Sequence, residues 1–309
     1  MPLAPEAQTF LQQAHDGGGP PLWQLDPVAA RAVAGGFTEL IGAGPALAEV
    51  GELQIPVSGA QIAGRRYRPA GARGTIVWLH GGGWVLDGID SSDAMCRILA
   101  DSAGATVISV DYRVAPEHPF PTPLDDCWEA LRWVAAQLDE DGWPLVIGGD
   151  SAGGNMAAVI ARRARDAGGP PLAAQILVYP VTDHDMTTPS YLEHGANEML
   201  LLEANAMRWF WDNYVPDPAA RADPDASPLR AADLRGLAPA IVVIAEYDPL
   251  RDEGLAYAER LRAAGVEVSL HRYADMPHVF FSFVNLFPTG NAAVARVGGE
   301  VRETIAAAG

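Results

Sequence analysis

The segment Gly149-Asp150-Ser151-Ala152-Gly153 constrains most strongly what this chain can fold into. The apolar run Leu145–Gly148 precedes it and has the composition of a buried parallel strand. A helical pattern follows from Ala152 to Arg165, and Gly168-Gly169-Pro170-Pro171 ends it. A Gly-x-Ser-x-Gly motif between a strand and a helix holds its serine on a sharp, strained turn. These flanks favour a nucleophilic serine over a glycine-rich turn with an incidental serine.

A second glycine-rich motif, His80-Gly81-Gly82-Gly83-Trp84, directly follows another strand pattern at Thr75–Leu79. Glycine lets a backbone approach a substrate closely and point its amides inward. In sites of this type, one amide comes from the residue after the serine, here Ala152, and others come from the glycine loop. A phosphate-binding loop is the alternative, but it requires a following lysine, and the chain contains none. We therefore expect an oxyanion hole.

A nucleophilic serine needs a base, and the base needs an acid that orients it. With this motif they follow in the chain order Ser, Asp or Glu, His. Of seven histidines, His271 and His278 come after the other strand patterns. His271 lies inside the alternating strand Val266–Tyr273, so we expect it to be structural. His278 follows that strand, at the sheet edge where Ser151 also lies, and is the predicted base.

The acid is expected after the preceding strand, Ala240–Ala245. Asp248 comes at the end of that strand and is the predicted acid. Asp252 is interpreted as the cap of the helix that follows. Glu246 and Asp275 remain alternatives.

Five motifs occur together in this chain: HGGGW (His80 to Trp84), YRVAPEHPFP (Tyr112 to Pro121), GDSAGG (Gly149 to Gly154), EYDPLRDEG (Glu246 to Gly254), and His278 with Phe280 two residues later. In content and order they resemble the bacterial hormone-sensitive-lipase family of esterases in the α/β-hydrolase superfamily. The resemblance implies a triad of Ser151, Asp248 and His278. It also implies an oxyanion hole formed by the N–H groups of Gly82, Gly83 and Ala152.

The activity that the resemblance implies is that of a serine carboxylesterase acting on short- to medium-chain acyl esters through an acyl-enzyme, without a cofactor. Two alternatives are considered. One is a binding protein that kept the fold and lost catalysis. The other is an amidase or lipase that uses the same site.

Strand patterns alternate with helical patterns along most of the chain. The strands are expected near Glu52–Val57 and at Gln61–Arg68, Thr75–Leu79, Thr106–Asp111, Leu145–Gly148, Ala174–Tyr179, Ala240–Ala245 and Val266–Tyr273. The helices are expected at Asp90–Ala103, Leu124–Leu138, Ala152–Arg165, Glu253–Ala264 and Ala292–Ala307. This alternation predicts a mostly parallel eight-stranded sheet with an antiparallel start and helices on both faces. The resemblance implies that this sheet belongs to an α/β-hydrolase fold with a helical cap.

Two segments do not follow the alternation: residues 1–50 and residues 184–226. The resemblance implies that both form a helical cap over a catalytic domain of residues 51–309. Most apolar side chains of the second segment are expected to be packing.

Some large side chains are expected to line the substrate cavity. Trp209 and Phe210 come from the second cap segment, Trp84 and Asp87 follow the glycine loop, and Tyr179 ends a strand.

The formal net charge of −18 argues against nucleic acid, whose binding requires clustered cations. The chain has no apolar run of eighteen residues and no signal peptide at its start, so we expect no membrane insertion and a cytoplasmic location. His184 and His194 lack the neighbours of a zinc site, and no metal is expected. The resemblance implies a small-molecule ester as the partner. The sequence leaves the oligomeric state open, and a homodimer is considered.

Overall fold

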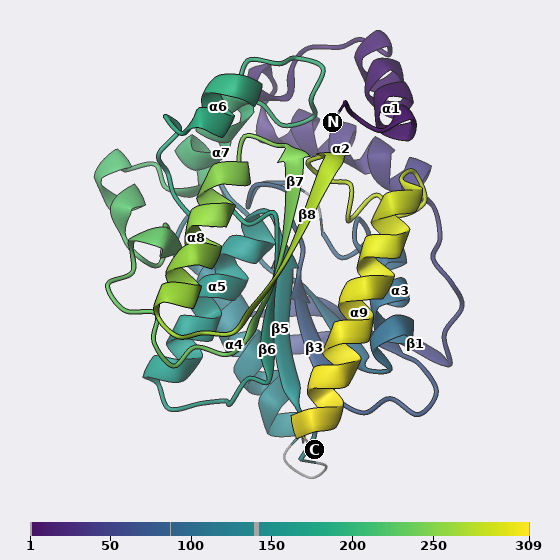
Figure 1. Ribbon diagram of the computed structural model, residues 1–309, viewed down its shortest axis with the longest axis vertical. Coiled ribbons are helices and arrows are strands. Elements are labelled where there is room, and N and C mark those ends of the chain that lie inside the picture. Colours follow the sequence, from purple (N-terminus) through teal and green to yellow (C-terminus); the bar gives the residue numbers. More distant parts are fainter. Residues whose placement is uncertain (1, 87, 139–141, 309) are drawn as a thin grey trace.

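The computed structural model describes residues 2–86, 88–138 and 142–308. Within them, eight strands form one sheet in the order β1-β2-β4-β3-β5-β6-β7-β8 (Figure 1). The strand β2 is antiparallel to β1 and β4, and all other neighbours are parallel. The predicted fold is confirmed. The strands are β1 (Glu49–Val57), β2 (Ala60–Arg68), β3 (Thr75–Leu79), β4 (Thr106–Asp111), β5 (Leu145–Asp150), β6 (Ala174–Val178), β7 (Ala240–Tyr247) and β8 (Val268–Pro277).

Helices cover both faces of the sheet (Figure 1). On one face lie α4 (Thr122–Leu138), α5 (Ala152–Asp166) and α8 (Arg251–Ala263), and on the other lie α3 (Asp93–Ala103) and α9 (Pro288–Ala308). Successive strand residues point to opposite faces. In β3, Val77 and Leu79 accordingly join one buried core, while Ile76 and Trp78 join the other. Because both cores are covered, β3 is buried at every position.

The parallel strands end at one edge of the sheet, and the chemistry-bearing residues come directly after them. His80 follows β3, Ser151 follows β5, Asp248 follows β7 and His278 follows β8. This edge is where open α/β sheets bind ligands. The sheet therefore gathers residues that lie far apart in sequence.

The N-terminal segment lies over this edge (Figure 1). It contains α1 (Pro5–Asp16), the short 3₁₀ helix η1 (Leu22–Gln24) and α2 (Pro27–Ile41). The Asp26 side chain accepts the N–H of Ala29 at 2.9 Å and caps α2. Arg31 of α2 donates to the carbonyl oxygens of Val85 and Ala115, both at 2.8 Å, and forms an ion pair of 2.6 Å with Glu117. One arginine thus ties α2 to the catalytic part of the chain.

The segment between β6 and β7 lies over the same edge (Figure 1). It contains α6 (Pro189–His194), α7 (Ala204–Tyr214) and the 3₁₀ helices η2 (Pro218–Ala222) and η3 (Pro228–Arg230). Trp211 and Tyr214 of α7 are fully buried, in agreement with the expectation that most of its apolar residues are packing.

Two local expectations were wrong. The strand β8 continues to Pro277, because a register irregularity between Ala245 and Tyr247 lets Tyr247 pair with Pro277. Asp252 does not cap α8, which is preceded by Leu250. The Asp252 carboxylate instead accepts the N–H of Ser190 at 2.8 Å.

The packing of α9 on α3 makes a stability prediction. A methyl group added at Gly298 would lie 2.0 Å from Ser102 Oγ and 2.8 Å from Ser102 Cβ. Gly298→Ala should therefore lower the free energy of unfolding by about 1–3 kcal/mol, as overpacking does. Gly299→Ala is the matched control, because no atom lies within 4 Å of its added methyl group. It should raise stability by about 0.5–1 kcal/mol. Urea unfolding of both variants tests this, and equal effects would contradict it.

Candidate active site

Ser151 sits on a turn that close packing enforces. Its backbone has φ 55° and ψ −117°, which is unfavourable for a residue with a side chain. A methyl group on Gly149 would lie 2.4 Å from the carbonyl carbon of Gly153, and one on Gly153 would lie 2.0 Å from the Leu79 oxygen. Both glycines are therefore required because the turn presses against β3.

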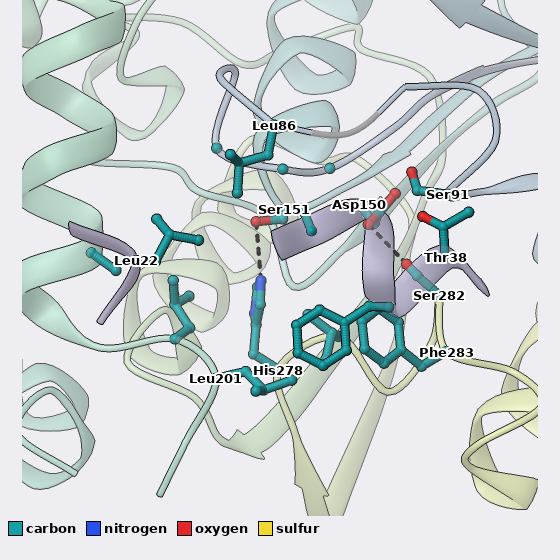
Figure 2. Close-up of a pocket in the computed structure, with 18 of the residues that line it drawn as sticks. Leu22, Thr38, Leu86, Ser91, Asp150, Ser151, Leu201, His278, Ser282 and Phe283 are labelled. Atoms are coloured by element: carbon teal, nitrogen blue, oxygen red, sulfur yellow. Dashed lines mark hydrogen bonds between the residues drawn. The ribbon is translucent and has the colours of Figure 1, made fainter. Parts of the chain in front are cut away.

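Ser151, His278 and Asp248 form one hydrogen-bonded series. Ser151 Oγ lies 3.0 Å from His278 Nε2 (Figure 2), and His278 Nδ1 lies 2.6 Å from Asp248 Oδ2. The other Asp248 oxygen accepts the N–H of Leu250 at 2.8 Å. All three side chains are buried, and Asp248 completely so. This geometry lets a carboxylate orient the imidazole while the imidazole takes a proton from the serine.

Glu246 and the other histidine are engaged elsewhere. Glu246 forms ion pairs of 2.9 Å with Arg251 and 3.0 Å with Arg272. His271 pairs with Glu300 of α9 at 2.8 Å. His278 contacts Asp248, and not Glu246, Asp252 or Asp275, in the structure.

The glycine loop and the start of α5 present backbone amides beside Ser151. Gly82 and Gly83 have φ of 95° and 59°, conformations that glycine adopts readily, and both line the cavity that contains Ser151. Ala152 is the first residue of α5, so its N–H has no acceptor within the helix. His80 supports the loop: its ring stacks on Tyr112 at 4.2 Å, and its Nδ1 lies 2.8 Å from the Gly81 oxygen. Burial lowers the pKa of His80.

The cavity over Ser151 is enclosed by both segments that lie outside the sheet. The N-terminal segment contributes Leu22, Val33, Ala34, Phe37, Thr38 and Ile41, and the segment between β6 and β7 contributes Leu201, Leu202, Ala206 and Phe210. The Phe210 ring packs on Gly83, where an added methyl group would lie 2.2 Å from it. Phe210 thus lies where the sequence predicted it.

The other residues expected in the cavity are placed differently. Trp84 is fully buried behind the loop, because its ring stacks on Tyr214 at 4.3 Å and packs on Trp211 at 4.9 Å. Tyr179 is buried behind His278, with their rings 4.4 Å apart. Trp209 packs on the Phe210 ring at 5.3 Å and is not among the residues that line the cavity. Asp87 lies outside the described residues.

Sequence reasoning assigned no role to Asp150, which also lines the cavity. The Ser282 hydroxyl donates to Asp150 Oδ2 at 2.9 Å, and the Tyr179 hydroxyl lies 3.0 Å from Ser282 Oγ. Burial raises the pKa of Asp150 to about 6, against the opposing effects of the Ser282 hydrogen bond and the charge of His278. The one sequence feature that could have indicated a role for Asp150 is its position inside the motif that carries Ser151.

Backbone strain also gathers at this edge. Among the described residues, Trp84, Ser151, Tyr179 and Val279 have positive φ although none is glycine. All four lie beside the carboxyl ends of strands, and Val279 directly follows His278. Such strain persists where surrounding structure over-determines the backbone, as it does at active sites.

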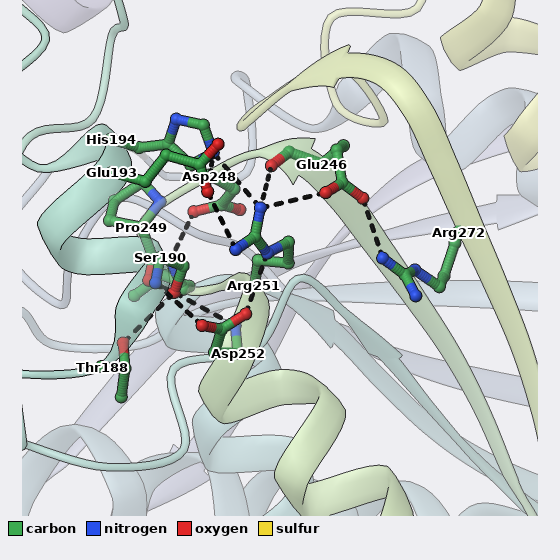
Figure 3. A network of polar contacts seen from close by, with 11 residues as sticks. Thr188, Ser190, Glu193, His194, Glu246, Asp248, Pro249, Arg251, Asp252 and Arg272 are labelled. Atoms are coloured by element: carbon green, nitrogen blue, oxygen red, sulfur yellow. Dashed lines mark hydrogen bonds and ion pairs between the residues drawn. The ribbon is translucent and has the colours of Figure 1, made fainter. Parts of the chain in front are cut away.

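A polar network braces the loop that carries Asp248 against α6 (Figure 3). Ser190 of α6 donates its hydroxyl to the Pro249 oxygen at 2.7 Å and its N–H to Asp252 at 2.8 Å. Arg251 pairs with Glu246 and Asp252 at 2.9 Å and with Glu193 at 3.1 Å. The acid is therefore held from both sides of its loop.

Comparison with known proteins identifies the family of this chain. Residues 76–282 match the family described as alpha/beta hydrolase fold. The chain belongs to this family. Among its relatives, the carboxylic ester hydrolase LipN of Mycobacterium tuberculosis is 40% identical over 281 residues, covering 87% of this chain and 73% of LipN. The carboxylesterase NlhH of the same species is 45% identical over 228 residues, covering 72% of this chain and 70% of NlhH.

A solved structure of a thermostable esterase from Pseudomonas putida superposes with a TM-score of 0.93. It is 40% identical, and the match covers 98% of both chains. The resemblance to the hormone-sensitive-lipase esterases is thus confirmed, and the chain is a carboxylic ester hydrolase of this family.

The bracing network can be tested with Arg251→Gln. Loss of the guanidinium leaves Glu193, Glu246 and Asp252 without their shared cation, so unfolding free energy should fall by about 1–3 kcal/mol. A looser acid loop should also lower kcat several-fold. Arg235→Gln is the matched control, because its pair with Asp233 is largely exposed and should leave both quantities unchanged. Similar effects of the two variants in urea unfolding and ester assays would refute the bracing role.

The raised pKa of Asp150 predicts a pH-dependent stability. The buried carboxyl ionises near pH 6 rather than at its ordinary pKa of 3.8, so its ionisation costs stability above pH 6, equivalent to about 3 kcal/mol. Below pH 4 the carboxyl is protonated in both the folded and the unfolded chain, and the cost vanishes. Asp150→Asn should therefore be more stable than the parent protein at about pH 8 by about 2–3 kcal/mol, with the gain declining between pH 6 and pH 4.

Asp101→Asn, at an exposed position on α3, is the control for this measurement. Because its side chain is exposed, this substitution should change stability by much less than Asp150→Asn at pH 8. Thermal unfolding across the pH range measures both variants. A pH-independent difference for Asp150→Asn would show that burial does not raise this pKa.

Proposed function

We propose that this protein is a serine carboxylesterase that hydrolyses short- to medium-chain acyl esters through an acyl-enzyme on Ser151. The observation that carries the proposal is the hydrogen-bonded series from Ser151 through His278 to Asp248, which opens into an enclosed cavity. The family of esterases to which the chain belongs supports the same reaction.

The reaction follows from the positions of these groups. His278 Nε2 takes the proton of Ser151 as Oγ attacks the ester carbonyl carbon. Asp248 holds the imidazole with Nδ1 protonated and stabilises its cationic form. The imidazolium then gives its proton to the leaving alcohol. A water molecule, deprotonated by the same imidazole, attacks the acyl-enzyme and releases the acid.

The N–H groups of Gly82, Gly83 and Ala152 form the oxyanion hole in this proposal. They are backbone donors fixed before the substrate arrives, so they stabilise the developing negative charge without reorganisation. Removal of one such donor in other enzymes costs about a hundred- to a thousandfold in kcat.

The N-terminal segment and the segment between β6 and β7 act as a cap over this site. Both contribute apolar side chains to the cavity, and Phe210 binds substrate while it covers Gly83. The cavity volume is about 150 Å³. It is small beside the roughly 300–1,000 Å³ of pockets for drug-sized ligands, which supports short to medium acyl chains over the long chains of a lipase substrate.

The remaining expectations are part of the same proposal. A non-catalytic binding protein would not need hydrogen bonds that join Ser151 to His278 and His278 to Asp248. These two hydrogen bonds therefore favour catalysis over binding alone. No helix in the described part of the chain is long and apolar enough to cross a membrane. A cytoplasmic location, and a homodimer as the alternative to a monomer, remain predictions from the sequence.

Ser151→Ala tests the nucleophile. Without Oγ no acyl-enzyme forms, so kcat for a p-nitrophenyl butyrate assay should fall on the order of a millionfold. A fluorophosphonate probe should label the parent protein at Ser151, as detected by mass spectrometry, and leave the variant unlabelled.

Ser102→Ala is the matched serine control, because Ser102 lies on α3 and binds its own helix backbone. It should keep both hydrolysis and labelling. Hydrolysis retained by Ser151→Ala would rule out the assigned nucleophile. A parent protein that binds esters without turnover would favour the non-catalytic alternative, and faster turnover of an amide or an emulsified triglyceride would favour the amidase or lipase alternative.

A further inference from the structure

The cavity has two chemically different sides, and Ser151 and His278 lie between them (Figure 2). Leucine side chains form one side, including Leu22 and Leu201. The polar groups Thr38, Ser91, Asp150 and Ser282 lie on the other side, where the Phe283 ring also lies beside Ser282. An ester bound at Ser151 therefore has one end among leucines and the other end among hydroxyl and carboxyl groups.

Three of the four groups on the polar side, Ser91, Ser282 and Asp150, offer acceptors rather than donors. The Ser282 proton is donated to Asp150 Oδ2, so the Tyr179 hydroxyl must donate to Ser282 Oγ. The Ser91 hydroxyl donates to the Gly88 oxygen at 2.8 Å. A hydroxyl has one proton, and an ionised carboxylate has none. A ligand can therefore bind only to the lone pairs of Ser91, Ser282 and Asp150, as a hydrogen-bond donor.

Burial makes this acceptor set selective. Asp150 and Ser282 are only 6% and 8% exposed. A buried polar group that loses its partner costs more than an exposed one. A substrate that supplies a donor at this position is favoured, while an apolar group or a carbonyl oxygen leaves the acceptors unpaired.

The polar side also begins close to the reacting atom. Asp150 directly precedes Ser151, and both residues line the cavity (Figure 2). This adjacency places the complementary donor of the substrate near the ester group.

We propose that this site selects esters that carry a hydroxyl group near the ester bond, with Asp150, Ser282, Ser91 and Thr38 forming the subsite for that hydroxyl. The inference rests on the proposed esterase function and specifies its substrate class. The hydroxyl donates to the acceptor cluster, while the hydrocarbon on the far side of the ester packs among the leucines.

Two series of esters of equal shape test the proposal. In the acyl series, ethyl β-hydroxybutyrate, ethyl isovalerate and ethyl acetoacetate exchange a hydroxyl for a methyl or a carbonyl. In the alcohol series, β-hydroxypropyl, isobutyl and acetonyl butyrate make the same exchanges. We expect kcat/KM for the hydroxyl ester to exceed that for the methyl ester about tenfold in one series, with the carbonyl ester no better than the methyl ester. The series in which the hydroxyl ester is preferred shows whether the subsite binds the acyl part or the alcohol part of the substrate.

A hydroxyl-to-methyl ratio of one or less in both series would overturn the proposal, and so would an equal preference for the carbonyl ester. Failure of every ester to react would instead refute the proposed function. The two failures are therefore distinguishable.

Variants locate the subsite. Ser91→Ala and Thr38→Val remove hydroxyls with little change of volume, and each should lower the hydroxyl-to-methyl ratio at least threefold. Leu22→Val, on the opposite side, is the matched control. It should alter kcat/KM for both esters and leave their ratio as in the parent protein. A ratio unchanged in Ser91→Ala and Thr38→Val, or lowered equally by Leu22→Val, would place the selectivity elsewhere.

The pH dependence of the same ratio tests Asp150. The titratable groups around it are His278, Tyr179 and Cys96. Protonation of His278 slows both esters alike and cancels in the ratio. Burial raises the pKa of Asp150 to about 6, so the hydroxyl preference should decline as pH falls through 6 and an acceptor is lost. A preference that stays constant across this range would exclude Asp150 from the subsite.

Discussion

The approach of α5 to the end of β3 is the contact on which the rest of the site depends. Gly153 lies so close to the Leu79 and His80 carbonyl oxygens that a methyl group would be 2.0 Å and 2.6 Å from them. That closeness sets the serine turn beside the glycine loop. Ser151 and the backbone of the glycine loop therefore lie side by side, although some seventy residues separate them in sequence. The strained backbone of Ser151 is maintained because the sheet and α5 hold both ends of the turn.

The sheet and the triad could be predicted from sequence because both depend on local patterns and on the direction of parallel strands. Apolar runs identified β3, β5 and β7. The residues that directly follow these strands are His80, which begins the glycine loop, and the candidate site residues Ser151 and Asp248. The sequence favoured Asp248 by its place at the end of the strand but left Glu246 as an alternative, and the structure shows His278 hydrogen-bonded to Asp248. The strand β8 was predicted too short because its last residues pair with β7 across a register irregularity, which a period-two pattern does not show.

The cavity wall was harder to predict because it depends on side-chain direction in segments without a sheet to fix them. Phe210 and Trp209 are neighbours on α7, yet only Phe210 lines the cavity. Trp84 follows the glycine loop, but aromatic packing with Tyr214 and Trp211 draws it away. The residues that α2 contributes gave no signal, since they become neighbours of Ser151 only when Arg31 docks that helix.

The Phe210 ring occupies the space that a side chain at position 83 would fill. Helix α7 and the glycine loop are therefore in direct contact across the cavity at this point. The ring packs directly against the backbone of Gly83 and so supports the position of the loop. A displacement of α7 would remove that contact. A substrate large enough to displace Phe210 would therefore also disturb the backbone of Gly83, so the size of the substrate and the geometry of the glycine loop are linked through one side chain.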